Sequence, residues 1–507
     1  MYINISKGRC EMAQISVNGK WIEADDGALL IDVLHKNGVD IPHFCYHPSL
    51  GKDGNCRMCM VEIEGKKRPQ IACDTPVSEG QVIRTKGENI DKVKRSILEL
   101  ELINHPVDCP ICDQAGECKL QDYYMDVGLY DSRLDTPKTH AKKHVELGSS
   151  VMLDQERCVL CTRCVRFTKN ITKTNELGVL NRADGSVIST FPGKKLDNPY
   201  AMNVIDLCPV GALTSQDFRF HKRVWFLKSF DAICNGCAKG CNIHVDHHKE
   251  KYKDDVIYRY RPRVNEKVNG YFICDYGRLT YKKQNENRLF ENYVHEKESA
   301  FSHALRELNT FLTKHKNNVT FILSPSLSLE EMQMAKLVAS EYGASLHVNT
   351  FGYEDKTFGD DFLKRNDLAM NKNGAMKLGL HVSDSEPKEI LKDSQAVVFI
   401  GLDNSDSWID TSSTLNVPSV LIDSYKSKFT SICHCVLAMA SHMEREGSFI
   451  NSDGILQTSD GGVVKNRQAP SLTEIFGLLL KWENFDNEFI WEKELSKILD
   501  NVTKVEL

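Results

Sequence analysis

The run His105-Pro-Val-Asp-Cys109-Pro-Ile-Cys112-Asp-Gln-Ala-Gly-Glu-Cys118 places one histidine close to three cysteines in a stretch rich in turn-forming residues. Cysteine thiolates, joined at some sites by imidazole, are the side chains that hold iron–sulfur clusters. Only three cysteines lie within reach here, so His105 is the natural fourth ligand beside Cys109, Cys112 and Cys118, which predicts one [4Fe-4S] cluster. A neutral imidazole in place of a thiolate makes such a cluster less negative and tends to raise its potential.

A second group of cysteines precedes this run. Cys45, Cys56, Cys59 and Cys73 could supply two thiolates to each iron of a [2Fe-2S] cluster. Gly51 and Gly54 give the loop between the first two cysteines the freedom to fold around the inorganic sulfides. That loop is longer than in plant-type ferredoxins. Residues 13–17, 20–23 and 28–37 predict a strand, a second strand after the turn Asn18-Gly19, and a helix, as in a ferredoxin-like β-grasp fold.

A third group begins as bacterial ferredoxins do. Cys158, Cys161 and Cys164 have the Cys-x2-Cys-x2-Cys spacing, but the position of the next ferredoxin cysteine is Thr168. In bacterial ferredoxins that next cysteine is followed by a proline, and Cys208-Pro209 further along the chain supplies such a pair. One [4Fe-4S] cluster closed by Cys208 is therefore predicted, because two clusters would need ligands that this region lacks.

A fourth group, Cys234, Cys237, Cys241 and Cys274, again suits a [4Fe-4S] cluster, with Gly236, Gly240 and Gly277 beside it. Structural zinc is the alternative for each group, because paired Cys-x2-Cys ligands also build zinc ribbons. Four groups in series favour clusters and one-electron conduction. Cys10, Cys433 and Cys435 remain, and they are expected to be free thiols.

The composition of the whole chain narrows the class of protein to which these cysteine groups belong. The chain has 507 residues, of which 41% are hydrophobic, with a formal net charge of -6, so it is core-forming and nothing argues for nucleic acid as a partner. No apolar run is long enough to span a membrane, and the polar N-terminus lacks a signal peptide, which favours the cytoplasm. Neither a dinucleotide fingerprint nor a nucleophile motif is present, so no independent substrate site or catalytic residue is predicted.

The sequence pattern changes after about residue 290. Strands predicted at 319–323, 345–348, 395–400 and 418–422 alternate with helices at 298–315 and 329–342, the latter capped by Ser328, which indicates an α/β domain with a parallel sheet. Earlier, Asn89 is expected to cap a helix over 90–104 with Leu100 and Ile103 on its apolar face. The pair His247-His248 and the basic run 258–263 are expected to be solvated.

The run from His105 to Asp122 resembles the signature of the large iron–sulfur subunit of respiratory complex I, the family of the G subunit or 75 kDa subunit of NADH-quinone oxidoreductase. The resemblance extends over the first and third groups, where that family carries a two-iron and a four-iron cluster. The fourth group resembles an additional cluster of some bacterial members, thought to lie off the main electron route. Glu446-Gly-Ser-Phe-Ile-Asn451 resembles a run of the family's molybdopterin-oxidoreductase-like domain.

The resemblance implies a multidomain α+β and α/β architecture. Too few residues follow Cys274 to wrap molybdopterin, and no later cysteine has the context to bind molybdenum, so the last domain is expected to be shortened and free of that cofactor. The expected domains are a [2Fe-2S] ferredoxin-like β-grasp domain (12–88), a [4Fe-4S] module with one histidine and three cysteine ligands (89–131), a [4Fe-4S] ferredoxin-like module (145–225), a [4Fe-4S] molybdopterin-oxidoreductase-type module (226–285) and a shortened α/β molybdopterin-oxidoreductase-like domain (286–507).

The resemblance also implies a function. Electrons would enter from a flavin-bearing, NADH-oxidising subunit and pass through the two-iron cluster, the Cys158 cluster and the His105 cluster. They would then reach quinone-side iron–sulfur subunits, in a complex that couples the reaction to proton translocation. The chain would meet the membrane only through this complex, in its peripheral arm on the cytoplasmic side of the inner (plasma) membrane.

Other interpretations remain open. A cluster-carrying subunit of a formate dehydrogenase or hydrogenase complex shares the N-terminal array of clusters, but formate dehydrogenase needs a long molybdopterin domain and iron-only hydrogenase needs more cysteines after residue 280. Arg157, Arg163 and Arg166 flank the Cys158 group and are expected to raise the potential of its cluster, because positive charge stabilises an added electron.

Overall fold

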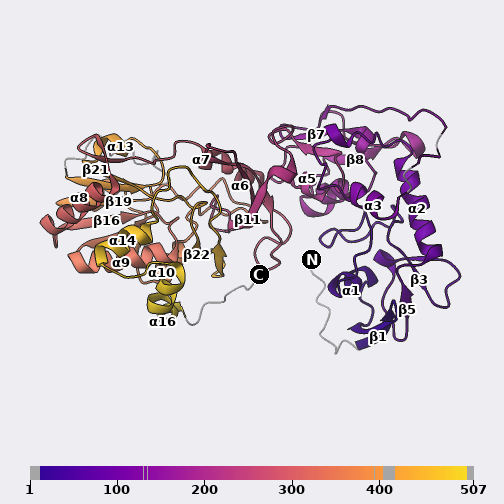
Figure 1. Ribbon diagram of the computed structural model, residues 1–507, viewed down its shortest axis with the longest axis horizontal. Helices are drawn as coiled ribbons and strands as arrows, with labels where there is room; N and C mark the ends of the chain where they lie inside the picture. Colours follow the sequence, from indigo (N-terminus) through magenta and orange to yellow (C-terminus); the bar gives the residue numbers. More distant parts are fainter. Residues whose placement is uncertain (1–11, 129–130, 134, 393, 403–416, 500–507) are drawn as a thin grey trace. The chain divides into compact units, whose positions relative to one another are not determined.

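The computed structural model describes residues 12–128, 131–133, 135–392, 394–402 and 417–499, so Cys10 lies outside the described part of the chain. The chain divides into two compact units, Met1–Trp225 and Phe226–Leu507 (Figure 1). The first unit holds small sheets and short helices, and the second holds a large sheet between layers of helices. The expected mixture of α+β and α/β architecture is confirmed.

The first unit begins with a five-stranded sheet in the order β2-β1-β5-β3-β4. Strand β1 is antiparallel to β2 and parallel to β5, and the Asn18-Gly19 turn has positive φ at both residues, as a tight hairpin requires. Helix α1 (Leu30–Lys36) buries Leu30 and Leu34 in the core beneath this sheet. The strands are β1 (Met12–Val17), β2 (Lys20–Asp25), β3 (Met60–Ile63), β4 (Gln70–Ile71) and β5 (Val82–Arg84).

Helix α2 (Glu88–Leu102) differs from its prediction in its cap and its buried face. Gly87 is the N-cap residue, and the Asn89 side chain instead donates a hydrogen bond to Glu62 at 2.6 Å. The buried residues are Ile90, Lys94 and Leu98, which follow one another at a spacing of four, whereas Leu100 and Ile103 are exposed. The expected cap and part of the expected apolar face are therefore wrong.

The rest of the first unit is built from short elements between cysteine loops. Helix α3 (Lys119–Val127) packs on α2, and helices α4 (Arg163–Arg166) and α5 (Asn203–Leu207) pack on each other. The strands form one three-stranded sheet and one hairpin: β6 (Val145–Glu146), β7 (Val151–Leu153) and β10 (Leu213–Ser215), and β8 (Leu177–Leu180) with β9 (Val187–Thr190).

The second unit begins with an antiparallel sheet of β11 (Lys228–Ile233), β12 (Asn242–Lys249) and β13 (Asp255–Pro262). His247 is buried, with its Nδ1 atom 2.7 Å from Asp255, so its expected exposure is wrong. In the basic run, Arg259 and Arg261 both bind Asp246 across the strands, and their side chains are partly covered. Pairing with this carboxylate on the neighbouring strand replaces the expected contact with solvent.

An eight-stranded sheet follows, in the order β15-β14-β21-β20-β19-β16-β17-β18. Strands β16 to β21 pair in parallel, and β14 and β15 add an antiparallel edge that was not predicted. The strands are β14 (Asn292–Val294), β15 (Lys297–Ser299), β16 (Val319–Leu323), β17 (Ser345–Asn349), β18 (His381–Ser383), β19 (Ala396–Ile400), β20 (Ser419–Asp423) and β21 (Cys435–Ala438).

Helices cover both faces of this sheet. Phe321 and Val398 face a core shared with α8 (Phe301–Lys314), α9 (Leu329–Tyr342) and α14 (Leu472–Leu480). Phe399 and Leu421 point to the other face, where α13 (Phe429–Ile432) packs, and Figure 1 shows α13 across the strands from α9 and α14. The alternation follows from the period of two along each strand.

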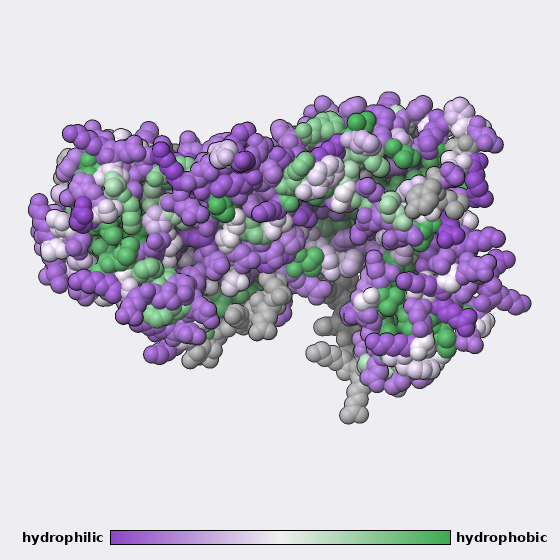
Figure 2. All heavy atoms as spheres, viewed as in Figure 1, coloured by the Kyte–Doolittle hydropathy of each residue, from purple (hydrophilic) through white to green (hydrophobic). Residues whose placement is uncertain are grey.

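The remaining elements of the second unit are short, and one hairpin among them lies close to the fourth cysteine group. They are α6 (Asp275–Leu279), α7 (Tyr281–Asn285), α10 (Lys372–Lys377), α11 (Pro387–Leu391), α15 (Asn487–Ile490), α16 (Ser496–Leu499) and the hairpin β22 (Gly447–Ile450) with β23 (Leu456–Ser459). Within the described ranges, the helices lack the length and apolar character needed to cross a bilayer. The visible face of each unit is mainly hydrophilic (Figure 2).

Candidate metal centres

The first cysteine group lies under the β-grasp sheet. Cys45, Cys59 and Cys73 are buried, and their loop turns at Gly51 and Gly54, whose φ values are 70° and 75°. The four thiols are close enough to hydrogen-bond to one another. These bonds lower the pKa of Cys45 and Cys59, which accept, and raise the pKa of Cys56 and Cys73, which donate. The structure therefore brings all four predicted ligands together.

The four cysteines of the third group line one small cavity. Cys158, Cys161 and Cys164 come from the turn before and into α4, and Cys208 ends α5. The rest of the lining is mainly apolar and includes Leu153, Val159, Ile188, Val210, Ala212 and Leu213. Burial raises the pKa of Cys161 to about 12, so these thiols stay protonated until a metal displaces the proton.

The second group is less enclosed. Cys112 and Cys118 are buried, whereas His105 and Cys109 are half-buried. Burial raises the pKa of Cys118 to about 11 and also raises the pKa of Cys112, which lies near Cys109. Burial lowers the pKa of His105 to about 4, which keeps the imidazole neutral at pH 7, as metal ligation requires. Asp108 and Arg157 lie near both His105 and Cys112.

The fourth group also lines a single cavity, together with glycines. The backbone N–H groups of Gly236 and Gly277 donate to the sulfurs of Cys234 and Cys274, at 3.4 and 3.3 Å. A Cβ atom on Gly277 would lie 2.8 Å from the Cys234 sulfur and 3.3 Å from that of Cys274. Glycine is therefore needed where the backbone closes on the sulfurs.

Segments far away in the sequence cover this fourth group. Leu363 lines its cavity, and the Ala238 N–H donates to the carbonyl of Asp367 at 2.9 Å. From the other side, the Ser452 N–H donates to the Ala238 carbonyl at 2.7 Å, and Gln457 donates to the carbonyl of Gly240 at 3.1 Å. The Cys237–Cys241 loop is thus held between the 363–367 segment and the β22–β23 hairpin.

These sites have the chemistry that iron–sulfur clusters need. In the third and fourth groups, four sulfurs converge in mainly apolar surroundings, and backbone N–H groups point at sulfur, as at 3.4 Å from Leu160 to Cys158. The Tyr260 hydroxyl is fully buried near Cys234 and has no hydrogen-bond partner among the described residues. A sulfur-rich group would give this hydroxyl an acceptor. Among the residues described, no three His, Cys, Asp or Glu side chains form a site for a metal ion by themselves.

Arginines join the first and third groups. Arg163 donates to the carbonyls of Leu207 and Tyr46, at 3.1 and 2.5 Å, and is buried. Arg166 donates to the carbonyls of Cys45 and Gly51, the latter at 2.9 Å. The two cysteine loops therefore lie side by side.

The third and second groups are joined as well. Arg157 makes a bidentate pair with Asp108, at 3.0 and 2.6 Å, so this arginine faces the second group more than the third. The Lys119 N–H donates to the Pro209 carbonyl at 2.9 Å, and a Cβ on Gly211 would lie 2.3 Å from the Cys112 sulfur. The Cys208-Pro209 segment thus packs against the second group, so the third group contacts both of the others.

Some residues around the fourth group were missed in the sequence. Lys239 could have been singled out from the sequence, because a lysine between two close cysteines is unusual in a buried loop. The sequence gives no indication of Leu363, Arg365 and Asp453, because only the tertiary fold brings them to the cysteines. Cys433 and Cys435 are both buried.

Comparisons with known families match most of the first half of the chain. The matching family models, with the residues matched, are the 2Fe-2S iron-sulfur cluster binding domain (11–88), the NADH-ubiquinone oxidoreductase-G iron-sulfur binding region (94–133), the NADH-quinone oxidoreductase subunit 3 ferredoxin-like domain (148–214) and the molybdopterin oxidoreductase Fe4S4 domain (227–286). Binding regions for both two-iron and four-iron clusters are thus present.

Several curated relatives are similar over a longer stretch. The NADH-quinone oxidoreductase G subunit of Rickettsia conorii is 36% identical over 349 residues, which is 68% of this chain and 51% of that protein. The NADH-ubiquinone oxidoreductase 75 kDa subunit of Reclinomonas americana is 35% identical over 342 residues, 66% of this chain and 48% of that protein. The chain spans about half the length of these curated relatives.

A solved structure is also similar, the NAD+-reducing [NiFe]-hydrogenase in the H2-reduced state. It is 28% identical with a TM-score of 0.38, and the match covers 42% of this chain and 91% of that chain. The cysteine groups, the matching family models and the curated relatives agree. The chain therefore belongs to the family of the large iron–sulfur subunit of NADH-quinone oxidoreductase, known as the G subunit or the 75 kDa subunit.

Proposed function

We propose that this chain is an electron-transfer subunit that holds one [2Fe-2S] and three [4Fe-4S] clusters. When bound, the clusters would supply one-electron carriers. The chain's own residues would ligate them, exclude water and donate hydrogen bonds to their sulfurs. The proposed ligands of the two-iron cluster are Cys45, Cys56, Cys59 and Cys73. Each four-iron cluster has its own set of four proposed ligands: His105, Cys109, Cys112 and Cys118 for the second group; Cys158, Cys161, Cys164 and Cys208 for the third; and Cys234, Cys237, Cys241 and Cys274 for the fourth.

One observation carries the proposal: the third cysteine group is tied directly to both the first and the second. Arg163 and Arg166 hold the first loop against the third, and Arg157 holds the third against the second. These contacts agree with the route that the family resemblance implies.

At the level of the complex, we propose a role in NADH-quinone oxidoreductase, coupled to proton translocation by the whole assembly. The partners would be a flavin subunit on the donor side and iron–sulfur subunits on the quinone side. The curated relatives, which bear the name of such subunits, support this assignment. The chain would then lie in the peripheral arm on the cytoplasmic side of the membrane.

For the second unit, we propose a module of residues 226–285 around the fourth group and a scaffolding α/β domain of residues 286–507 without molybdopterin. Modules of residues 12–88, 89–131 and 145–225 would carry the other three groups. The buried core of the eight-stranded sheet supports a structural role, because Phe321, Val398 and Ile422 pack tightly between helices.

The test is a joint measurement of iron, acid-labile sulfide, zinc and molybdenum on the anaerobically purified full-length chain. The proposal expects about 14 irons per chain with matching sulfide, and Cys208→Ser should lose about four of them. Cys433→Ser, a change at a buried cysteine outside the groups, should lose none. Zinc in place of sulfide would overturn the electron-transfer role, and stoichiometric molybdenum would overturn the scaffolding role.

A further inference from the structure

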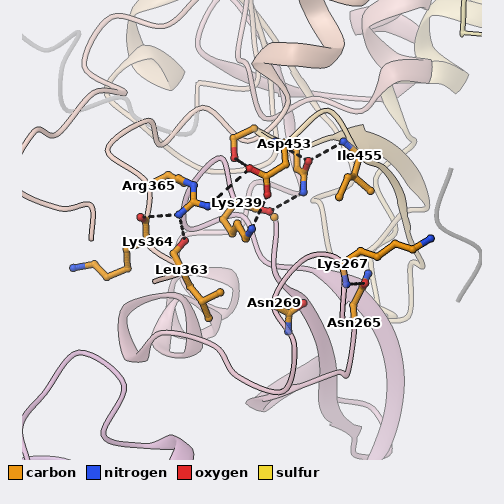
Figure 3. Close-up of polar contacts among 12 residues, drawn as sticks. Lys239, Asn265, Lys267, Asn269, Leu363, Lys364, Arg365, Asp453 and Ile455 are labelled. Atoms are coloured by element: carbon orange, nitrogen blue, oxygen red, sulfur yellow. Dashed lines mark hydrogen bonds and ion pairs between the residues drawn. The ribbon is translucent and has the colours of Figure 1, made fainter. Parts of the chain in front are cut away.

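A buried lysine lies between two of the cysteines proposed to hold the fourth cluster. The Lys239 side chain is 8% exposed, and its Nζ atom is 2.6 Å from Oδ2 of Asp453, in the turn between β22 and β23. Figure 3 shows Lys239 and Arg365 both pointing toward Asp453. Arg365 is 3.8 Å from the other oxygen of this carboxylate. A buried ammonium group has to be paired, because its desolvation is costly.

The pair is held rigidly against the cysteine loop. The Asn451 side chain donates to the Lys239 carbonyl at 3.2 Å, and Asn451 also accepts from the Asp453 N–H at 3.0 Å. Together with the bond from Ser452 to Ala238, these contacts fix the position of Asp453 relative to Cys237 and Cys241. The two charges therefore act on the cysteine site from fixed positions.

Charges of both signs surround the site. Three positive charges lie near the cysteines: Lys239 near Cys241, Arg365 near Cys237 and Lys364 near Cys274. Two negative charges are also close, Asp360 near Cys237 and Asp275 near Cys274. The Asp453 side chain is 36% exposed, so water screens its charge more than that of Lys239. The Lys239 charge is therefore the less screened of the two.

We propose that Lys239 and Asp453 set the reduction potential of the cluster held by the fourth cysteine group, with opposite signs. The inference rests on the proposed function, since it needs a cluster at these cysteines. Reduction adds one electron to the cluster and breaks no bond, so a nearby positive charge favours the reduced form and a negative charge opposes it. Neither side chain is a ligand.

The experiment is a redox titration of the purified full-length chain with its clusters, using dithionite as the electron donor and electron paramagnetic resonance to follow each cluster. Lys239→Met should lower the midpoint potential of the fourth cluster, and Lys239→Arg should leave it near the wild-type value. Asp453→Asn should raise it. Lys253→Met is the matched control, because Lys253 pairs with Glu250 at 2.7 Å on an exposed turn and should change none of the potentials.

Opposite shifts are the decisive result, because a general disturbance of the loop would move both variants in the same direction. Unchanged potentials in Lys239→Met and Asp453→Asn, or shifts of the same sign, would overturn the inference while leaving the cluster assignment intact. If Lys239→Met fails to retain the cluster, Asp453→Asn decides alone, and a potential that does not rise overturns the inference. A wild-type chain without a fourth cluster would overturn both the inference and the ligand proposal.

Discussion

One buried arginine contributes both to the packing and to the electrostatics of the third cysteine group. Arg163 is buried, its hydrogen bonds go to two backbone carbonyls, and its charge acts on Cys161 and Cys208. A guanidinium in this position satisfies the backbone and places a positive charge beside the third cysteine group at the same time.

We expect Arg163→Gln to lower the midpoint potential of the third group's cluster, because the charge that stabilises the reduced form is removed. A redox titration followed by electron paramagnetic resonance measures this. Arg182→Gln, at an exposed arginine of the same unit, is the control and should leave the potential unchanged. An unshifted potential in Arg163→Gln would show that the arginine only ties the two loops together.

A partly buried histidine predicts how stability depends on pH. Burial lowers the pKa of His442 to about 4, while its Nε2–H donates to the Ile233 carbonyl at 2.8 Å. The unfolded chain binds the proton near pH 6.5, so the stabilising contribution is complete above that pH. It is lost as the pH falls from about 6.5 to about 4, by up to about 3 kcal/mol.

Unfolding of the full-length chain by denaturant, followed between pH 7 and pH 4, checks this. The free energy of unfolding of His442→Gln should fall less steeply with acid than that of the wild type. His303→Gln, at an exposed histidine, should keep the wild-type slope. Equal slopes for wild type and His442→Gln would mean that another group dominates acid unfolding.

At the scale of elements, the glycine at the centre of α6 limits the space around the fourth group. Gly277→Ala should lose about four irons per chain, because its new Cβ would lie 2.8 Å from the Cys234 sulfur. Gly185→Ala, where the new Cβ has no neighbour within 4 Å, should retain full iron. Iron analysis of the two purified variants decides, and full iron in Gly277→Ala would mean that the backbone can yield at this position.

Some of the helices and strands could be predicted from the sequence, and others could not. Helix α9 is as predicted, because Ser328 and Glu331 form a capping box and Gly343 ends the helix in a left-handed conformation. The cap of α2 was mispredicted, because a tertiary contact to Glu62 competes for the Asn89 side chain. The edge strands β14 and β15 have three residues each, and they become strands because β14 pairs with β21 and β15 pairs with β14.

The same limit applies to the candidate sites. The spacing of cysteines was enough to group Cys158, Cys161 and Cys164 with the distant Cys208, because the Cys-Pro pair repeats a ferredoxin feature. The spacing of the cysteines cannot predict the ion pair between Arg157 and Asp108 or the one between Lys239 and Asp453, because these contacts depend on how separate loops pack. The ligand sets themselves stay predictions until metal is measured.

At the scale of the whole molecule, the two units should respond differently to loss of metal. The first unit relies on short elements around cysteines, whereas the second has a continuous apolar core around Phe321 and Val398. After anaerobic chelation of iron, hydrogen–deuterium exchange should rise in residues 158–164 and stay slow in strands β16, β19 and β20. Equal loss of protection in both regions would show that the chain unfolds as one unit.

The enclosure of the cysteine groups by distant segments also constrains how the protein matures on the ribosome. The third group lacks its last wall until Cys208 and strand β10 have emerged. The fourth lacks its cover until Leu363 and the turn at Asp453 have been synthesised and folded. With the proposed cluster at the fourth group, iron would therefore have to arrive before these later segments fold over the site, or during a transient opening of them.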